Sequence, residues 1–223
     1  MNKKSLTTTS LPPIETPWQN LINATRNTAL SQAKLEIFSY KSKTISLQEL
    51  TGTALLRLHS LRSSEKLNDA LSKCEFVLPE KVNQSLGQDP AIICMAPGNW
   101  LLFSEYLKPL RLSGQLESAL EGDDTTVLDL SASSTTFRLG GEGMKWLLCK
   151  VCGLDIFENF NAQAQAARTR IQQAAVSLHY HQPGSKSDEF TLDLIVERSI
   201  ASYLWHILVD AIPHAEELHD LYG

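Results

Sequence analysis

The sequence predicts an α+β fold made of two similar modules that pack against each other. Short apolar runs with a period of two alternate with stretches of helical period, and this succession occurs once in each half of the chain. The stretch 190–212 shows both periods in turn. Its first part alternates apolar and polar residues, as a strand with one buried face does, and from Ser199 the apolar residues fall at helical spacing. Ser199 is the expected N-cap, and Pro213 is expected to end the helix.

The first module is expected at residues 31–124. Apolar runs separated by Ser, Lys, Gly and Thr predict strands, and Ser64 suits the N-cap of an amphipathic helix. Pro97-Gly98 is a turn signal between two apolar runs. The expected elements are strands at 35–37, 45–47, 55–58, 91–94 and 100–103, and helices at 64–74 and 115–120.

The second module is expected at residues 125–212 and repeats this plan. A polar, alanine-rich connection separates its first half from its last hairpin. The expected elements are strands at 127–130, 136–139, 175–179 and 190–197, and helices at 144–152 and from 199 onward. This order indicates two packed ferredoxin-like α+β modules. Residues 1–30 predict a mobile or draped N-terminal arm, and residues 213–223 a solvated C-terminal tail.

The composition is that of a soluble globular protein. The 223 residues are 43% hydrophobic and 20% charged, with a formal net charge of -5. Because no Lys/Arg-rich block occurs, neither nucleic acid nor an anionic membrane is an expected partner. The N-terminal lysines are followed by no apolar segment, so we expect no secretory signal, and no run is suited to cross a membrane. Four cysteines in apolar surroundings predict free thiols and a cytoplasmic protein.

Three groups of residues invite a chemical interpretation, and each has a simpler structural one. Cys149 and Cys152 form a CxxC pair at the expected end of a helix, where the dipole disfavours a thiolate, so packing is the better explanation. The glycine run 140–143 fits no phosphate-binding motif and predicts a tight turn. His179 and His181 share a strand face and could offer two metal ligands, but a solvated strand end is the favoured interpretation. We therefore predict no catalytic residue, no cofactor-binding residue and no metal site.

The C-terminal helix carries a second apolar row beside its main stripe. Trp205, Val209 and Ile212 form this row, which leaves only a narrow polar seam. One interpretation places the helix between two layers of its own domain, and the other places this row against another polypeptide. Trp18, in the N-terminal arm, is expected to dock on a neighbouring surface. These four residues are the predicted subunit interface.

Four separated blocks give the sequence a resemblance to a known family. The first two are Ala-Pro-Gly-Asn-Trp-Leu-Leu at 96–102 and Leu-Asp-Leu-Ser at 128–131. The third is Thr-Phe-Arg-Leu at 136–139 with the helix that leads into Cys-Gly-Leu-Asp at 152–155, and the fourth is Arg-Ser-Ile-Ala-Ser-Tyr-Leu-Trp at 198–205. In this order and spacing the blocks resemble the gamma subunit family of heterotetrameric sarcosine oxidase. The resemblance extends from about residue 50 to residue 212.

This resemblance implies a fold, a role and partners. The fold would be that of the folate-binding domain of the glycine-cleavage T-protein, an aminomethyltransferase. The chain would be an accessory subunit that assembles with alpha, beta and delta subunits. The complex would demethylate sarcosine oxidatively to glycine, with hydrogen peroxide and formaldehyde or methylenetetrahydrofolate as the other products. FAD, FMN, NAD and tetrahydrofolate would be bound by the other subunits, and this chain would bind no cofactor.

Two alternatives stay open on the sequence. The first is a free-standing folate-binding protein of the T-protein superfamily. The second is a zinc or redox protein that uses Cys149 and Cys152. Tight folate binding by the isolated chain would favour the first, and stoichiometric metal would favour the second.

Overall fold

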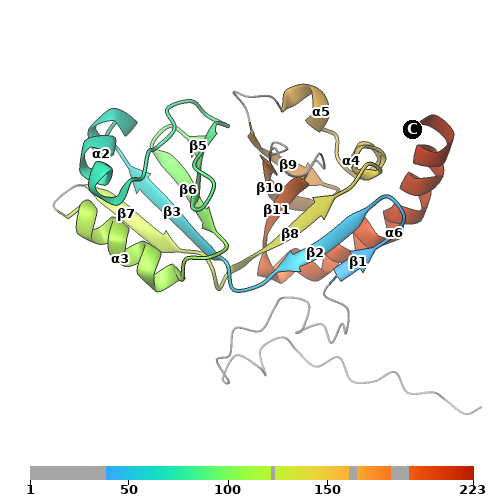
Figure 1. Ribbon diagram of the computed structural model, residues 1–223, viewed down its shortest axis with the longest axis horizontal. Coiled ribbons are helices and arrows are strands. Elements are labelled where there is room, and N and C mark those ends of the chain that lie inside the picture. The colour runs from blue at the N-terminus through green and yellow to red at the C-terminus, as the bar shows by residue number, and fades with distance from the viewer. Residues whose placement is uncertain (1–38, 122–123, 161–164, 182–190) are drawn as a thin grey trace, which may run out of the picture.

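The computed structural model describes residues 39–121, 124–160, 165–181 and 191–223. Two antiparallel sheets face each other in a V, close together at the base and splayed at the top, and helices cover their outer faces (Figure 1). The predicted N-terminal arm and Trp18 lie outside the described residues. Within the described part of the chain, no helix is long and apolar enough to cross a membrane. The predicted α+β fold class is confirmed.

The six-stranded sheet combines both ends of the described chain. Its order is β1-β2-β8-β11-β10-β9, and every neighbouring pair is antiparallel. Its strands are β1 (Ser39–Lys41), β2 (Ser46–Leu50), β8 (Ser134–Gly140), β9 (Ala166–Ile171), β10 (Ala174–His181) and β11 (Thr191–Glu197). The outer face carries the larger apolar core, which it shares with α4 (Met144–Val151), α5 (Ile156–Asn159) and α6 (Arg198–Tyr222).

The five-stranded sheet is built from the middle of the chain. Its order is β4-β5-β6-β3-β7, again antiparallel throughout. Its strands are β3 (Ala54–Ser60), β4 (Ser85–Leu86), β5 (Ala91–Ala96), β6 (Asn99–Ser104) and β7 (Thr125–Asp129). Helix α2 (Ser64–Leu71), the short 3-10 helix Ser72–Cys74 and α3 (Pro109–Ala119) cover its outer face and close a second core.

The two sheets do not divide the chain at the predicted module boundary near residue 125. Strands β1 and β2 precede the five-stranded sheet in sequence but pair into the six-stranded one, and β7 still belongs to the five-stranded sheet. The cause is a shared core: Leu47 of β2 pairs with Leu139 of β8, and both side chains are fully buried. A strand that buries its apolar face against the helices of another segment joins that segment's sheet.

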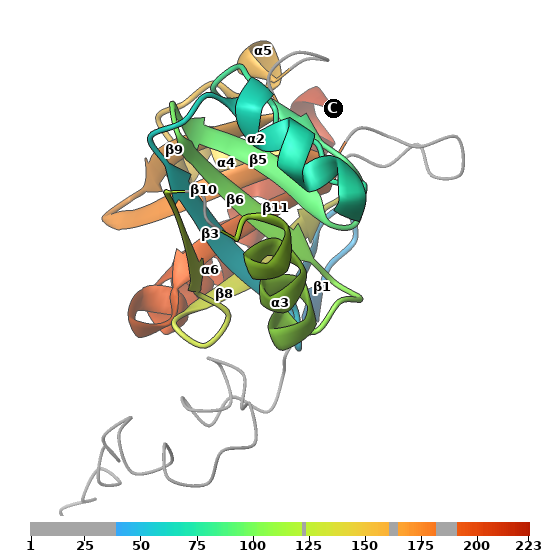
Figure 2. The ribbon, with the colours of Figure 1, turned by 90° about the vertical axis from the view of Figure 1, so that its left-hand side faces the viewer.

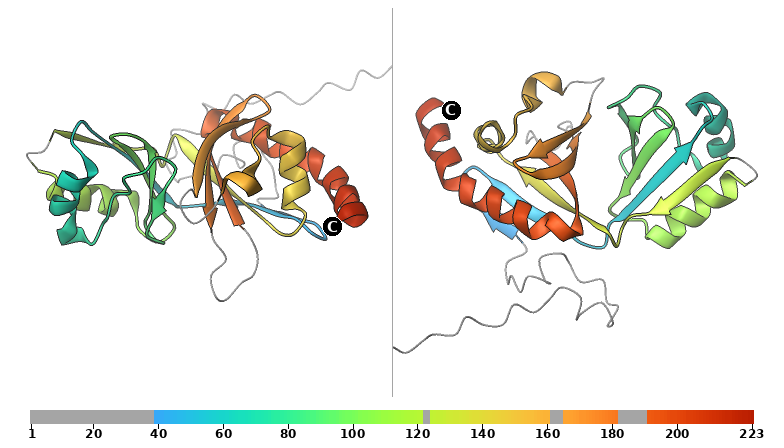
Figure 3. Two further views of the ribbon diagram at one scale, coloured as in Figure 1. Left: turned by 90° about the horizontal axis from the view of Figure 1, so that it is seen from above. Right: turned by 180° about the vertical axis from the view of Figure 1, so that it is seen from behind.

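Two features of the second half differ from the sequence predictions. The polar, alanine-rich connection contains α5 and an edge strand, β9, which the low apolar content concealed. Helix α6 begins at Arg198 with Glu197 as its N-cap, and it continues through Pro213 to Tyr222, so the predicted solvated tail is the end of this helix. The right-hand view of Figure 3 shows α6 bending as it runs past the outer side of the six-stranded sheet. Such a bend is expected where proline removes one helical hydrogen bond.

Contacts with the β1–β2 turn hold the helix beyond the proline. Glu216 accepts a hydrogen bond from the backbone N–H of Thr44 at 3.1 Å, and Lys43 forms an ion pair with Asp220 at 2.7 Å. Ala215 is fully buried in the larger core. These tertiary contacts outweigh the local preference of Pro213 to end a helix, because helical stability in proteins comes mostly from packing.

The predicted interface row on α6 lies largely inside the fold. Trp205 is only 6% exposed and its ring lies 5.6 Å from that of Phe137, while Ile212 is fully buried. Val209 is partly buried against the same core. For Trp205 and Ile212 this burial agrees with the interpretation that α6 is wedged between layers of its own domain. A role of this row in subunit contacts stays a prediction.

Replacing Trp205 tests this burial. Trp205→Ala removes a large side chain from the core, so the free energy of unfolding of the isolated chain should fall by about 3–5 kcal/mol. Urea denaturation followed by far-UV circular dichroism measures the change. Tyr203→Ala is the matched control, because Tyr203 is on the same helix but 41% exposed. If both variants unfolded at the wild-type midpoint, Trp205 would not be a core residue of the free chain.

Candidate functional site: the cleft between the sheets

The inner faces of the two sheets carry two polar and charged clusters. In β11 the residues Leu192 and Leu194 belong to the outer core, so the alternation of strand side chains turns Asp193 and Ile195 toward the other sheet. A small apolar cluster joins the sheets at the middle of these faces. Its buried members are Leu55, Ile93, Leu101, Phe103, Ala166 and Ile195. Polar residues lie on either side of this cluster.

On one side a buried carboxylate organises a polar network. Asp193 is fully buried, and its two oxygens accept hydrogen bonds from Nε and a terminal nitrogen of Arg138, both at 2.8 Å. His181 Nε2 lies 2.6 Å from the second oxygen. These partners come from three adjacent strands, β8, β11 and β10, so the sheet register itself brings them together.

The network also reaches the five-stranded sheet. Arg138 forms an ion pair at 2.8 Å with Glu105, which follows β6. Ser85 of β4 lies 2.9 Å from His179 Nε2, and the backbone N–H of Ser85 donates to Gln165 Oε1 at 3.0 Å. These contacts bridge the sheets at residues far apart in sequence.

The charges of the network are fixed by these contacts. Burial alone would raise the pKa of Asp193, but the hydrogen bonds from His181 and Arg138 outweigh it and hold that pKa below its usual value. Burial would lower the pKa of Arg138, yet its bonds with Asp193 and Glu105 raise it, so the guanidinium stays charged. Burial, and next the neighbouring His181, lower the pKa of His179 to about 3, so this ring is neutral.

The arrangement does not form a nucleophile–base–acid set. Ser85 and His179 are in hydrogen-bond contact, as a nucleophile and its base would be, but a working base also needs an oriented second ring nitrogen. His179 Nδ1 is buried without a partner, and the carboxylate of Asp193 binds His181 instead. The two histidine rings meet edge to face with centroids 4.5 Å apart.

The same residues are close enough to suggest a metal site, but Arg138 argues against one. Ligand atoms of His179, His181 and Asp193 lie within 4.8 Å of one another. However, both oxygens of Asp193 are engaged, and a terminal nitrogen of Arg138 lies 3.5 Å from His181 Nε2. A cation already neutralises this carboxylate, so we assign the cluster a structural role. The predicted solvated strand end is wrong for His179, which is 5% exposed because β4 covers it.

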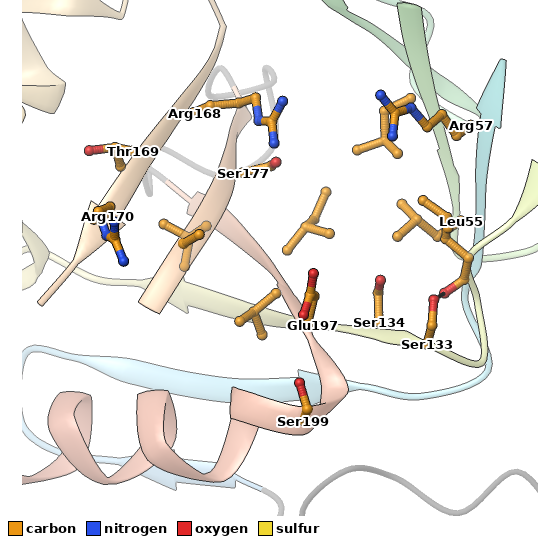
Figure 4. A pocket seen from close by; sticks show the side chains of 16 residues that line it. Leu55, Arg57, Ser133, Ser134, Arg168, Thr169, Arg170, Ser177, Glu197 and Ser199 are labelled. Atoms are coloured by element: carbon orange, nitrogen blue, oxygen red, sulfur yellow. Dashed lines mark hydrogen bonds between the residues drawn. The ribbon is translucent and has the colours of Figure 1, made fainter. Parts of the chain in front are cut away.

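The other side of the apolar cluster opens into a cavity of about 720 Å³. Arg57 of β3 approaches it from one sheet, and Arg168 and Arg170 of the edge strand β9 approach from the other (Figure 4). Leu55 and Ile195 belong to its apolar lining. Figure 2 shows the edge strands β7 and β9 on the same side of the molecule.

None of these three arginines forms an ion pair with a carboxylate of the described residues. Arg57 Nε donates a hydrogen bond to Asn99 Oδ1 at 3.0 Å. A terminal nitrogen of Arg170 donates one to the backbone carbonyl of Gln173, three residues along the chain, at 3.1 Å. The side chain of Arg168 has no hydrogen bond to the described residues, although its backbone pairs with β10. Sequence reasoning missed Arg168 and Arg170, although the alternation through β9 was a signal that could have found them.

The other motifs singled out in the sequence lie outside the cleft. Cys149 is exposed and Cys152 buried at the end of α4, and both are free thiols. Gly141 has a positive φ of 100°, and a Cβ there would meet the carbonyl oxygen of Thr44 at 2.2 Å. The glycine run is therefore a tight turn that permits close packing on the β1–β2 turn, as its spacing predicted.

Comparison with known proteins gives this fold a family. The model of the "Sarcosine oxidase, gamma subunit family" matches residues 73–214, more than half of the chain. The chain belongs to the sarcosine oxidase gamma subunit family. The resemblance found in the four sequence blocks is thereby confirmed.

Solved structures agree with this family. One chain of the heterotetrameric sarcosine oxidase from Corynebacterium sp. U-96, in complex with pyrrole 2-carboxylate, superposes with a TM-score of 0.70 at 22% identity, covering 85% of this chain and 95% of that one. Aminomethyltransferase T of the glycine cleavage system from Bartonella henselae gives a TM-score of 0.56 at 18% identity, covering 74% of this chain but 45% of that one. These likenesses show the fold, including the predicted T-protein-like architecture. A comparison with curated proteins finds no match.

Removing the central carboxylate should destabilise this gamma-family chain strongly. Asp193→Ala leaves the partly buried Arg138 without its main counter-charge, and losing one partner of a buried pair costs about 3–5 kcal/mol of unfolding free energy. Urea denaturation at neutral pH measures it. Glu105→Gln, which removes the more exposed partner of the same arginine, should cost about 1 kcal/mol or less. Equal losses in the two variants would mean that Asp193 is not the centre of the network.

His179 should make the protein sensitive to acid. Its pKa is about 3 in the folded chain, against an ordinary 6.5. As the pH falls below 6.5, the unfolded chain takes up a proton at this histidine before the folded chain does. The contribution of His179 to stability is therefore complete above pH 6.5 and is lost as the pH falls toward 3. The loss is at most about 1.4 kcal/mol per pH unit. Denaturation midpoints between pH 7 and 5 should show this slope in the wild type and a smaller slope in His179→Gln. An unchanged slope in His179→Gln would refute the assignment.

Proposed function

We propose that this chain is the accessory gamma subunit of a heterotetrameric sarcosine oxidase, in which it supports assembly and stability of the complex. The observation that carries the proposal is the family match over residues 73–214. The agreement of the fold along 95% of a chain of a heterotetrameric sarcosine oxidase supports it further. The reaction served by the complex is the oxidative demethylation of sarcosine to glycine, with hydrogen peroxide and formaldehyde or methylenetetrahydrofolate as the other products.

The inner face of the fold supports an accessory role over a catalytic one. In the described residues, the groups best suited to proton transfer or metal binding are His179, His181 and Asp193, and both oxygens of Asp193 are already engaged by Arg138 and His181. His179 is buried and neutral, with no carboxylate to orient it. Groups that satisfy one another in the resting protein are poor candidates for chemistry on a substrate, because a reaction would first have to break their contacts.

The partners and cofactors follow from the family. The chain assembles with other subunits of the oxidase, which we propose to be the alpha, beta and delta subunits. FAD, FMN, NAD and tetrahydrofolate are then held by those subunits, in a cytoplasmic complex. Of the predicted interface residues, Val209 is the member that its own core covers incompletely, so it is the one best placed to contact a partner. Trp18 belongs to the same proposal.

The alternative of a free-standing folate-binding protein gains no specific support. The likeness to aminomethyltransferase T shows the fold, and the chain spans less than half of that protein. The match to the gamma subunit family covers residues 73–214 and supports a subunit of a complex.

Co-expression tests the proposed function. Produced together with the alpha, beta and delta subunits, the chain should elute with them in one complex that oxidises sarcosine, while the purified chain alone should show no turnover. Leaving the chain out should lower the yield or the thermal stability of the complex. Size-exclusion chromatography and an assay of hydrogen peroxide provide both measurements. A chain that elutes alone in every preparation, or one that turns over sarcosine without companions, would overturn the proposal.

A further inference from the structure

We propose that the arginine-lined cleft between the two sheets receives an extended, acidic segment of a neighbouring oxidase subunit. The proposal rests on the proposed function and specifies the contact through which assembly would occur. It is carried by the cavity of about 720 Å³, by the three arginines around it, and by the apolar surface at its floor and rim.

Charge gives the first argument. The chain as a whole carries a formal net charge of -5, yet Arg57, Arg168 and Arg170 gather at this cavity. Glu197 is the acidic residue among those that line it, and as N-cap of α6 it lies at the positive end of that helix. The three arginines have no carboxylate partner in the described chain, whereas Arg138, on the same inner face, has two. The cleft therefore presents uncompensated positive charge on an acidic protein, and carboxylates complement it.

Shape gives the second argument. The three arginines are exposed and approach from both sheets, so the cleft is open to solvent, unlike a pocket that encloses a small ligand on most of its surface. Leu128 of the edge strand β7 is 51% exposed and pairs with Arg57 of β3, which places both side chains on the cleft side of the sheet. The recognition surface thus continues beyond the cavity. An extended polypeptide that alternates acidic and apolar side chains matches such a surface better than a compact molecule does.

The apolar floor completes the match. Leu55 and Ile195 line the cavity beneath the arginines, and Leu130 adds partly buried apolar surface beside them. A peptide side chain that covered this floor would exclude water from the arginine–carboxylate contacts. Ion pairs at a surface contribute little, but pairs sheltered by a surrounding apolar contact contribute more.

Charge reversal in the complete oxidase complex tests the proposal. The double variant Arg57→Glu/Arg168→Glu should weaken binding of the full chain to the other subunits by about tenfold or more, and the remaining affinity should depend less on salt. Arg111→Glu/Lys66→Glu makes the same charge change on helices of the outer face and should leave the affinity unchanged. The replaced residues are exposed, so circular dichroism and thermal unfolding should show wild-type folding.

Photo-crosslinking identifies the occupant. A benzoylphenylalanine in place of Ser177, whose side chain points into the cleft, should crosslink in the assembled complex to an acidic stretch of another subunit (Figure 4). The same group at Glu117, on the outer helix α3, should not crosslink to that stretch. Peptide mass spectrometry reads out both.

The outcomes separate this proposal from the proposed function. Two results would overturn the cleft proposal and leave the subunit role standing, provided that the wild-type complex assembles normally. The first is that the charge-reversed chain binds like the wild type. The second is that position 177 crosslinks to nothing, to a second copy of this chain or to a stretch without acidic residues. If the wild-type chain joins no complex at all, the subunit role falls and this proposal falls with it. Weakened binding together with a crosslink to an acidic stretch supports both.

Discussion

The buried carboxylate of Asp193 is the constraint on which the arrangement of the two sheets depends. A fully buried charge is tolerated only when it is paired and hydrogen-bonded, and Arg138 and His181 supply both conditions from the two flanking strands. Arg138 also forms an ion pair with Glu105, which follows β6 of the five-stranded sheet. The arginine that neutralises Asp193 in the six-stranded sheet therefore also ties the two sheets together. The sheets are thereby held together by a polar contact at one side of the small apolar cluster, and they are free to diverge at the other.

That asymmetry divides the inner face into two regions with different properties. Around Asp193 the polar groups satisfy one another, and His179 is forced to remain neutral by burial. Around Arg168 the groups are exposed and largely unpaired, although β10 and β11 contribute residues to both regions. Binding free energy is available only from groups that gain partners on association, so the second region, rather than the more conspicuous histidine cluster, is the one suited to recognition.

The sequence was sufficient for the fold class, the family and most strands, and it failed where tertiary contacts override local preference. Alternation with large apolar residues identified β11 and β8, because their buried faces are made of Leu, Val and Phe. Strand β9 escaped detection because two of its three buried residues are the small Ala166 and Ala167, and Arg168 and Arg170 were missed with it. Pro213 looked like a helix end, since the contacts that carry α6 past it, such as that of Glu216 with Thr44, join residues at opposite ends of the chain.

The pairing of β2 with β8 shows why such contacts matter for a subunit. It ties the start of the described chain to the last helix, through the β1–β2 turn that Gly141 packs against and α6 contacts. The five-stranded sheet is inserted in sequence between β2 and β8, so the six-stranded sheet needs segments from both sides of it to complete its core. A chain closed in this way presents the cleft before any partner binds. A preformed cleft loses little conformational entropy on association. This favours a structural role in which groups already held in place bind the partner, without a segment that has to fold on binding.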